Sequence, residues 1–411
     1  MGPAFAGARG ERLAQALLAI LLVVAGALLL YLNRDTSFWN DELTWFGNLA
    51  GPNNLESLLI PHNSHLIATT RVVYLLTAEV AGPEYLVMRL LGMASVLVAG
   101  ALFFVWAKRR IGPGWALLPA TLLLFYGSAW QHVVGPIGFT VIFSIALGLG
   151  ALVALDSPGR GRELLACALL TLSVLTYTVG LAYLVGVAVS VLLRRDRLRR
   201  AWIFLIPLLL YAAWWIWARE FDQDRTEAGN LLHVIEFFGR SMAANAGGIT
   251  GLNIPGLRIF GPEPATEGAP GALGWMAGAV LTIALIWRIV RGGLPRSFWA
   301  SLGVLVTFWL AAALADIREI GSQAAAIRYY FPGSSALLLV LVDAVSGMRI
   351  HSRWAVALLA AFAFSLAMNV VFLFGGAAYL REQGRDSRIE LAMVELRAGL
   401  EPGADGPQEV E

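Results

Sequence analysis

Four polar residues suited to acid–base chemistry lie in one stretch that follows the first apolar segment of the chain. Asp41 and Glu42 are adjacent, and His62 and His65 follow them, three positions apart. A positioned carboxylate can accept the proton of a hydroxyl group as that group attacks. Carboxylates and imidazoles together also offer the hydrogen-bond donors and acceptors that carbohydrate hydroxyl groups need. These residue types therefore favour contact with a sugar-containing substrate.

The carboxylate pair also has a purely structural interpretation. Asn40 is a good N-cap, and acidic residues in the first turn of a helix interact favourably with its dipole. Such an interfacial helix would present Trp45, Phe46 and Leu49 to the membrane. The two interpretations are compatible, because a helix N-terminus near a membrane surface is also a place where anions bind.

The two histidines would share one face of a helix beginning at Pro61. With the two carboxylates they could ligate a divalent metal, but two pairs separated by twenty positions are a weak metal motif. Alternatively, the two histidines lie in a loop, exposed to solvent, and have no functional role. We favour hydrogen bonding of His62 and His65 to the substrate, and we assign no metal or other cofactor.

Arg328 and Tyr329 stand just before the apolar run that starts at residue 330. A guanidinium offers a planar, permanently charged group for binding phosphate. The same pair also fits an interfacial belt, in which aromatic rings lie at headgroup level and arginine extends to water. The sequence leaves both interpretations open.

The composition indicates that membrane-spanning helices position these residues. Of 411 residues, 58% are hydrophobic and only 14% are charged, whereas soluble domains carry about a quarter charged residues. The apolar residues gather in continuous runs of about 16–22 residues, the length of a membrane-spanning helix. Backbone groups in lipid must pair within their own segment, and continuous apolar runs favour helices over a barrel. The sequence predicts an all-α, polytopic membrane protein.

About eleven spans are predicted, and the pair between residues 163 and 193 could instead be one kinked helix. The predicted spans are residues 13–32, 86–107, 112–130, 133–155, 163–177, 179–193, 201–218, 273–290, 298–315, 330–346 and 354–375.

Basic residues favour the eleven-helix topology, because loops rich in Lys and Arg stay in the cytoplasm. With a cytoplasmic N-terminus, every predicted inner loop is short and basic, and the C-terminus lies outside. These loops contain Lys108, Arg109, Arg110, Arg160, Arg162, Arg194, Arg195, Arg197, Arg199, Arg200, Arg288, Arg291, Arg296, Arg349 and Arg353.

Two long outer segments follow from this topology. The first extends from about residue 33 to residue 83, and includes the carboxylates, the histidines and predicted interfacial helices. The second extends from about residue 219 to residue 271 and contains Arg240. We predict a transmembrane catalytic domain over residues 1–375 and a short extracytoplasmic tail over residues 376–411.

Trp39-Asn40-Asp41-Glu42 in the first outer segment resembles the acidic motif of the GT-C superfamily, which includes protein O-mannosyltransferases and aminoarabinose transferases of lipid A. Pro83-Glu84-Tyr85 with Arg89 resembles the start of the second helix in that superfamily. Arg328-Tyr329 resembles an Arg-Tyr pair at a late helix. After the last predicted span we expect only a short tail in place of the large C-terminal soluble domain of some members, which leaves recognition of the acceptor open.

The resemblance implies a glycosyltransferase of the bacterial plasma membrane whose donor is a polyprenyl-phosphate-linked sugar. Asp41 would be the general base for an acceptor hydroxyl, and transfer would invert the anomeric carbon. Arg328 would stabilise the leaving phosphate, with Tyr329 beside it, and Arg240 or Arg225 in the second outer segment could replace or assist it. Glu42 completes the catalytic pair and would orient Asp41 or the sugar, together with His62 and His65.

The acceptor could be a glycan, a lipid or a protein, and no nucleic acid is expected as a partner. A non-enzymatic flippase or exporter of lipid-linked glycans is the alternative function, since it explains the helices equally well. The near absence of ionisable residues at mid-depth argues against an ion-coupled transporter.

Overall fold

The computed structural model describes residues 7–38, 42, 44–45, 53–82, 84–135, 138–221, 228–252, 270–315, 326–348 and 351–400. Over these residues the secondary structure consists of helices and one isolated β-bridge. The predicted all-α fold class is therefore confirmed.

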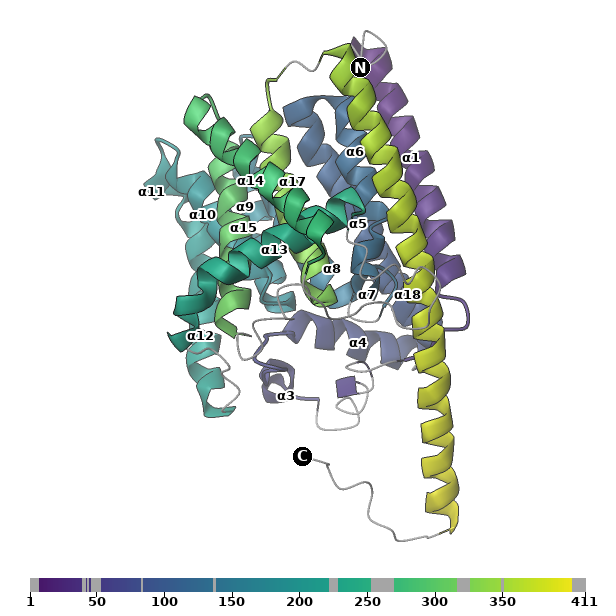
Figure 1. Cartoon of the computed structure of the whole chain (residues 1–411). Helices are drawn as coiled ribbons and strands as arrows, with labels where there is room; N and C mark the ends of the chain where they lie inside the picture. Colours follow the sequence, from purple (N-terminus) through teal and green to yellow (C-terminus); the bar gives the residue numbers. More distant parts are fainter. Residues whose placement is uncertain are drawn as a thin grey trace.

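An α-helix occupies each of the eleven apolar segments predicted from the sequence (Figure 1). These helices are α1 (Gly7–Leu32), α5 (Tyr85–Ile111), α6 (Pro113–Leu124), α8 (Gly138–Leu155), α9 (Arg160–Thr176), α10 (Gly180–Leu192), α12 (Trp202–Ala218), α14 (Ala272–Arg291), α15 (Arg296–Ala315), α17 (Tyr330–Val345) and α18 (Ser352–Leu400). Within the described ranges, seven helical segments are long and apolar enough to cross a membrane by themselves, namely those containing α1, α5, α8, α12, α14, α15 and α18. A polytopic membrane protein is thus supported, while a count of eleven spans stays a prediction.

Shorter helices connect and cover these segments. They are α3 (Leu55–Leu59), α4 (Ala68–Ala81), the 3-10 turn η2 (Gly127–Ala129), α7 (Trp130–Val133), α11 (Arg197–Arg200), the 3-10 turns η3 (Arg219–Phe221) and η4 (Ala228–His233), α13 (Val234–Thr250), and the 3-10 turn η6 (Ile327–Tyr329). Figure 1 shows α3 and α4 below the bundle, at the end opposite to the N-terminus.

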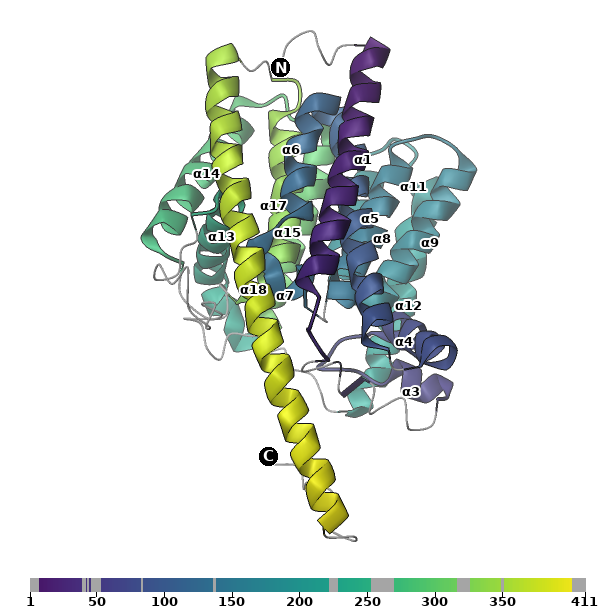
Figure 2. The same cartoon turned by 90° about the vertical axis from the view of Figure 1, so that its right-hand side faces the viewer.

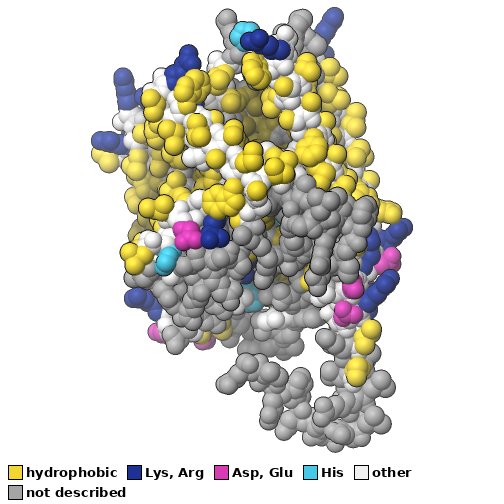
Figure 3. Space-filling view, in the orientation of Figure 1, with side chains coloured by type: hydrophobic (Ala, Val, Ile, Leu, Met, Phe, Trp, Pro, Cys, Tyr) yellow, Lys and Arg dark blue, Asp and Glu magenta, His cyan; other side chains and the backbone are white. Residues whose placement is uncertain are grey.

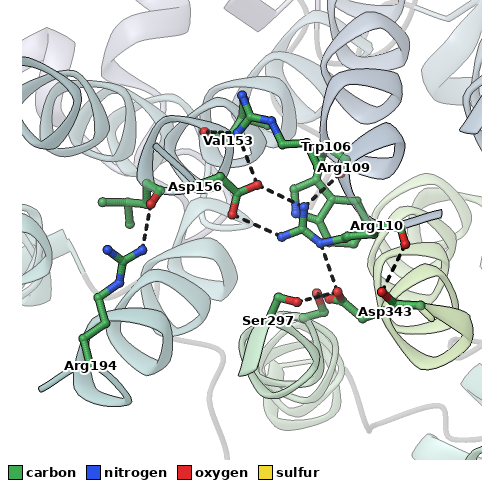
Figure 4. A network of polar contacts seen from close by, with 11 residues as sticks. Trp106, Arg109, Arg110, Val153, Asp156, Arg194, Ser297 and Asp343 are labelled. Atoms are coloured by element: carbon green, nitrogen blue, oxygen red, sulfur yellow. Dashed lines mark hydrogen bonds and ion pairs between the residues drawn. The ribbon is translucent and has the colours of Figure 1, made fainter. Parts of the chain in front are cut away.

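One end of the bundle is joined by a polar cluster around Asp343 (Figure 4). The buried Asp343 carboxylate accepts hydrogen bonds from Arg110 Nε at 2.9 Å, Ser297 Oγ at 2.6 Å and Ser301 Oγ at 2.7 Å. Arg110 also pairs with Asp156 at 3.0 Å. The C-terminal ends of α5, α8 and α17 and the start of α15 therefore meet at one face.

The predicted basic loops lie at this same face. Arg194 donates to the carbonyl oxygen of Leu155 at 2.7 Å, and Arg200 pairs with Glu163 at 3.3 Å. These contacts bring the end of α10 to the end of α8 and the start of α9. Residues 163–193 therefore form two helices that run in opposite directions, and the single kinked span is excluded.

The opposite face gathers the starts of α5, α10 and α17. Here Tyr126, after α6, bonds Ser334 at 2.5 Å, and the Ser334 hydroxyl donates to Asn245 Oδ1 at 2.9 Å. Asn245 belongs to α13, a helix within the second of the two predicted outer segments. A side chain at Gly248 would collide with the Tyr126 hydroxyl, so glycine permits α13 to pack into the bundle.

The core lies between the central helices, and α8 is its most buried member. By contrast, only 11% of the most apolar window of α14 is buried. Figure 3 shows the result on one face of the molecule, a broad band of hydrophobic side chains over its upper part, with Lys and Arg above it. Such a band is what lipid contact requires.

Helix α18 contains 49 residues and extends beyond the bundle at the end where α3 and α4 lie (Figure 2). Arg381, past the apolar part of this helix, donates to the carbonyl oxygen of Arg34 at 3.0 Å. The predicted boundary between residues 375 and 376 lies inside this continuous helix.

Candidate functional site

Glu42, which follows α1 in the chain, forms a buried ion pair with Arg89. The distance from Arg89 Nη2 to Glu42 Oε2 is 2.5 Å, and the two side chains are 3% and 0% exposed, respectively. Arg89 is placed by α5, one turn after that helix begins. The Tyr74 hydroxyl of α4 donates to the other carboxylate oxygen of Glu42 at 3.4 Å. The polar stretch is thereby fixed to two separate helices.

Aromatic side chains surround the ion pair. The guanidinium of Arg89 lies 4.6 Å from the ring centroid of Tyr85, a cation–π distance. The Tyr85 hydroxyl bonds Thr36, which follows α1. Burial, and secondarily the Glu42 carboxylate, raises the pKa of the Tyr74 hydroxyl, so that this group remains a proton donor. The Nε atom of Arg89 is buried and has no protein acceptor among the described residues.

Trp45 connects the ion pair to the first histidine. Its ring packs edge-on against Tyr74, with centroids 5.3 Å apart, and its indole N–H donates to His62 Nε2 at 3.2 Å. Only 5% of Trp45 is exposed. The prediction that Trp45 faces the membrane is therefore wrong, because the aromatic rings around Glu42 enclose this side chain.

His62 and His65 do not share a helix. Their backbones form two reciprocal hydrogen bonds, of 3.0 and 2.8 Å, so the chain reverses between them. Asn63 and Ser64 at the tip have φ angles of 47° and 66°. Positive φ at both central residues is typical of a type I′ turn. The predicted helix from Pro61 is wrong, but the two histidines still lie opposite each other, on one face of a tight hairpin.

The hairpin attaches to the break between α9 and α10. His65 Nδ1 and the Thr178 hydroxyl form a hydrogen bond of 2.7 Å, and the His65 ring packs on Tyr177 with centroids 4.5 Å apart. Tyr177 also packs against the cluster that contains Trp45 and Tyr74. The structure therefore brings Glu42, His62 and His65 together through shared aromatic neighbours.

Arg71 holds the α3–α4 layer in place, and the sequence analysis did not single it out. This α4 side chain donates to three carbonyl oxygens at the end of α3, those of Ser57, Leu58 and Ile60. It therefore satisfies groups that a helix leaves unpaired at its C-terminus. An arginine within an apolar helical pattern is the sequence signal that could have identified it.

Arg328, Tyr329 and Arg240 belong to a second region of the same face. Tyr329 packs on Phe237 of α13 and on Phe308 of α15, with centroids 6.2 and 6.1 Å away. The Arg328 guanidinium lies 5.2 Å from the ring of Tyr329. Arg240 pairs with Glu236 one turn earlier in α13, at 2.8 Å. These contacts of the three residues are with side chains of α13, α15 and η6.

Several candidate residues lie outside the described residues. They are Trp39, Asn40, Asp41, Phe46, Leu49, Pro83 and Arg225. The described residues contain no group of three or more His, Cys, Asp or Glu side chains that could hold a metal ion. The roles of Asp41, His62, His65, Arg328, Tyr329 and Arg240 therefore stay predictions.

Comparison with solved structures identifies the fold. No family model and no curated protein matches the chain. The chain is similar to the crystal structure of ArnT from Cupriavidus metallidurans bound to undecaprenyl phosphate, with a TM-score of 0.51 and 14% sequence identity. The similarity covers 94% of this chain and 81% of ArnT. The chain thus shares the fold of ArnT, which agrees with the fold that the resemblance predicted, and a sequence identity of 14% supports the fold alone.

Proposed function

We propose that this protein is a membrane glycosyltransferase of the GT-C type that takes a sugar from a polyprenyl-phosphate-linked donor. The sugar would pass to an acceptor hydroxyl on the extracytoplasmic face, with inversion. The observation that carries the proposal is the buried Glu42–Arg89 ion pair, which fixes the acidic stretch after α1 to the start of α5. The similar ArnT structure contains undecaprenyl phosphate, which supports a lipid phosphate as the donor.

In this proposal the two adjacent carboxylates have different tasks. Glu42 is fully buried and bonded to Arg89 and Tyr74, so it positions the stretch and does not itself take a proton from the acceptor. Asp41, its neighbour in the chain, is the general base. As the acceptor oxygen bonds to the anomeric carbon, its proton passes to Asp41, and the bond from that carbon to the phosphate oxygen breaks.

The leaving phosphate gains negative charge in this step, and a guanidinium stabilises it. Arg89 is already paired with Glu42, whereas Arg328 lies on η6 at the same face of the bundle. We therefore assign phosphate stabilisation to Arg328, with Tyr329 packed beside it and Arg240 as a second basic group. His62 and His65 bind sugar hydroxyl groups from the hairpin.

The packing of the bundle favours a transferase over a flippase or exporter. The central helices α5, α8, α10 and α17 share one apolar core. The Asp343 cluster connects helices at the end of the bundle opposite to the Glu42–Arg89 pair. A carrier would have to move a sugar headgroup through this core, where polar groups lose their hydration. By the basic loops, we place the N-terminus in the cytoplasm of a bacterium and the site outside its plasma membrane.

Transfer of radiolabelled sugar from a pool of polyprenyl-phosphate sugars into membrane acceptors tests the proposal. Asp41→Asn should lower the rate by a factor of about 10² to 10⁴, since general-base catalysis supplies that much. Glu79→Gln, a carboxylate change on α4 away from the pair, is the matched control and should keep full activity. Full transfer by a folded Asp41→Asn protein would reject Asp41 as base. Transfer by neither protein, with labelled lipid crossing the bilayer, would indicate the carrier.

A further inference from the structure

The connection between α10 and α12 contains five arginines, and the side chains of two of them bind other described residues. Arg194 bonds the carbonyl oxygen at the end of α8, and Arg200 pairs with Glu163 and with Asp196, the latter at 2.7 Å. The other three are exposed and form no ion pair with any described residue. They are Arg195, Arg197 and Arg199.

Acidic side chains near this connection are already neutralised. Glu163 is only 12% exposed and pairs with both Arg160 and Arg200, while Asp156 pairs with Arg109 and Arg110. The surface around α11 therefore has a surplus of positive charge. Figure 3 shows Lys and Arg side chains projecting at the edge where α11 lies in Figure 1, next to the hydrophobic band.

Leu198 gives this basic surface a second property. It stands between Arg197 and Arg199 and is 88% exposed, and Leu192 and Leu193 at the end of α10 are 48% and 40% exposed. A leucine flanked by arginines at the end of spanning helices fits the boundary between headgroups and acyl chains, where apolar groups enter lipid and guanidinium groups reach phosphate.

Trp202 marks the depth of this boundary. It begins α12 directly after the basic run, and the Arg160 guanidinium lies 4.5 Å from its ring centroid. Tryptophan is enriched at the level of lipid headgroups. The loop that contains Arg160 and the connection that contains α11 thus meet at one membrane surface.

We propose that Arg195, Arg197 and Arg199, together with Leu198, form a binding surface for anionic phospholipid, which we call the α11 lipid surface. The three guanidinium groups bind headgroup phosphates of the leaflet at the basic face, and Leu198 enters the acyl layer. This surface lies at the opposite end of the bundle from the Glu42–Arg89 pair. It is a separate site from that of the proposed transfer reaction, and does not depend on that reaction.

Lipid binding to the purified full-length protein tests the charge requirement. We expect wild type to bind phosphatidylglycerol more tightly than phosphatidylcholine, measured by native mass spectrometry at several lipid concentrations. Replacing Arg195, Arg197 and Arg199 by Gln should weaken phosphatidylglycerol binding by about fivefold per arginine, which is on the order of a hundredfold in total. The matched control, with Arg34, Arg385 and Arg388 replaced by Gln at the opposite end, should bind as wild type does. Equal binding by all three proteins would overturn the proposal.

The position of Leu198 gives a second, independent test in liposomes. Cys167 is buried, so Cys167→Ser provides a background in which a single Leu198→Cys can carry a fluorophore. We expect acyl-chain spin labels to quench it, whereas Arg385→Cys on the extension of α18 should be quenched only by aqueous iodide. Strong iodide quenching at Leu198→Cys, without acyl-chain quenching, would reject the lipid surface and favour an acidic protein segment as the occupant.

Discussion

Glu42 and Arg89 are 47 positions apart in the chain, yet their side chains form an ion pair that solvent barely reaches. Burying two charges costs desolvation energy, and their attraction offsets it only while both partners are present. The pair therefore makes the geometry of the first outer segment depend on the start of α5. A site built on this segment loses its position when either partner is removed.

Removing one partner should destabilise the protein strongly. Arg89→Ala leaves the buried Glu42 carboxylate unpaired and should lower the free energy of unfolding by about 3–5 kcal/mol. The double substitution Glu42→Gln with Arg89→Met removes both charges and should recover most of that loss. Thermal unfolding in detergent measures both effects. If the double substitution were as unstable as Arg89→Ala, the pair would not be coupled.

The hairpin tip offers a stabilising substitution. Ser64 has a φ of 66°, a conformation that costs most residues energy and that glycine adopts freely. Ser64→Gly produces the Asn-Gly sequence that type I′ turns prefer. It should raise stability, because glycine relieves about 1–2 kcal/mol of left-handed backbone strain, of which the added entropy of the unfolded chain offsets only a part. Ser64→Val should lower it, because a β-branched residue is disfavoured there. Reduced protease cleavage at the hairpin in Ser64→Gly, relative to wild type, would agree with this expectation, and increased cleavage would contradict it.

The Asp343 cluster should be the main polar contribution to stability at the basic face. Asp343→Ala removes the acceptor of Arg110, Ser297 and Ser301 at once, leaves Arg110 partly unpaired, and should cost about 3–5 kcal/mol. Asp343→Asn keeps the shape and should cost less. Sugar transfer by whichever variant remains folded should match wild type. Loss of transfer in a fully stable Asp343→Asn protein would show that the two faces are coupled.

Stability should fall in alkaline solution, and Tyr74 should contribute to the fall. Because burial raises the pKa of Tyr74 above the unfolded value of about 10, the folded state holds this proton more tightly. Its contribution is complete below pH about 10 and is lost as the pH rises further, since only the unfolded chain then releases the proton. Between pH 9 and 11, the midpoint temperature of unfolding should fall less in Tyr74→Phe than in wild type. An identical pH profile for both proteins would show that Tyr74 does not supply this dependence.

The spanning helices could be predicted because lipid imposes length and apolarity on each segment separately. The break at Tyr177-Thr178-Val179 was ambiguous in sequence, and was decided only by contacts between distant ends, such as Arg200 with Glu163. The basic loops were predicted to share one side, and the same contacts place them together. The hydrophobic pattern of each segment was therefore sufficient to predict the helices that lie in the membrane.

The outer elements were harder to predict, since tertiary contacts determine them. Trp45 looked lipid-facing because amphipathic spacing does not reveal that Tyr74 and His62 would cover its ring. The spacing of His62 and His65 suits a helix as well as a turn, and Asn63-Ser64 is a weaker turn signal than Asn-Gly. Arg89 was found only through the resemblance, and its pairing with Glu42 required the fold.

Helix α18 has a mechanical consequence. Its 49 residues correspond to a length of roughly 74 Å, more than twice the roughly 30 Å hydrocarbon thickness of a bilayer. It is anchored to the end of α1 through Arg381 and continues without a break past the level of α3 and α4 (Figure 2). The helix is therefore a rigid spacer. It holds any group attached near Leu400 at a fixed distance from the membrane surface.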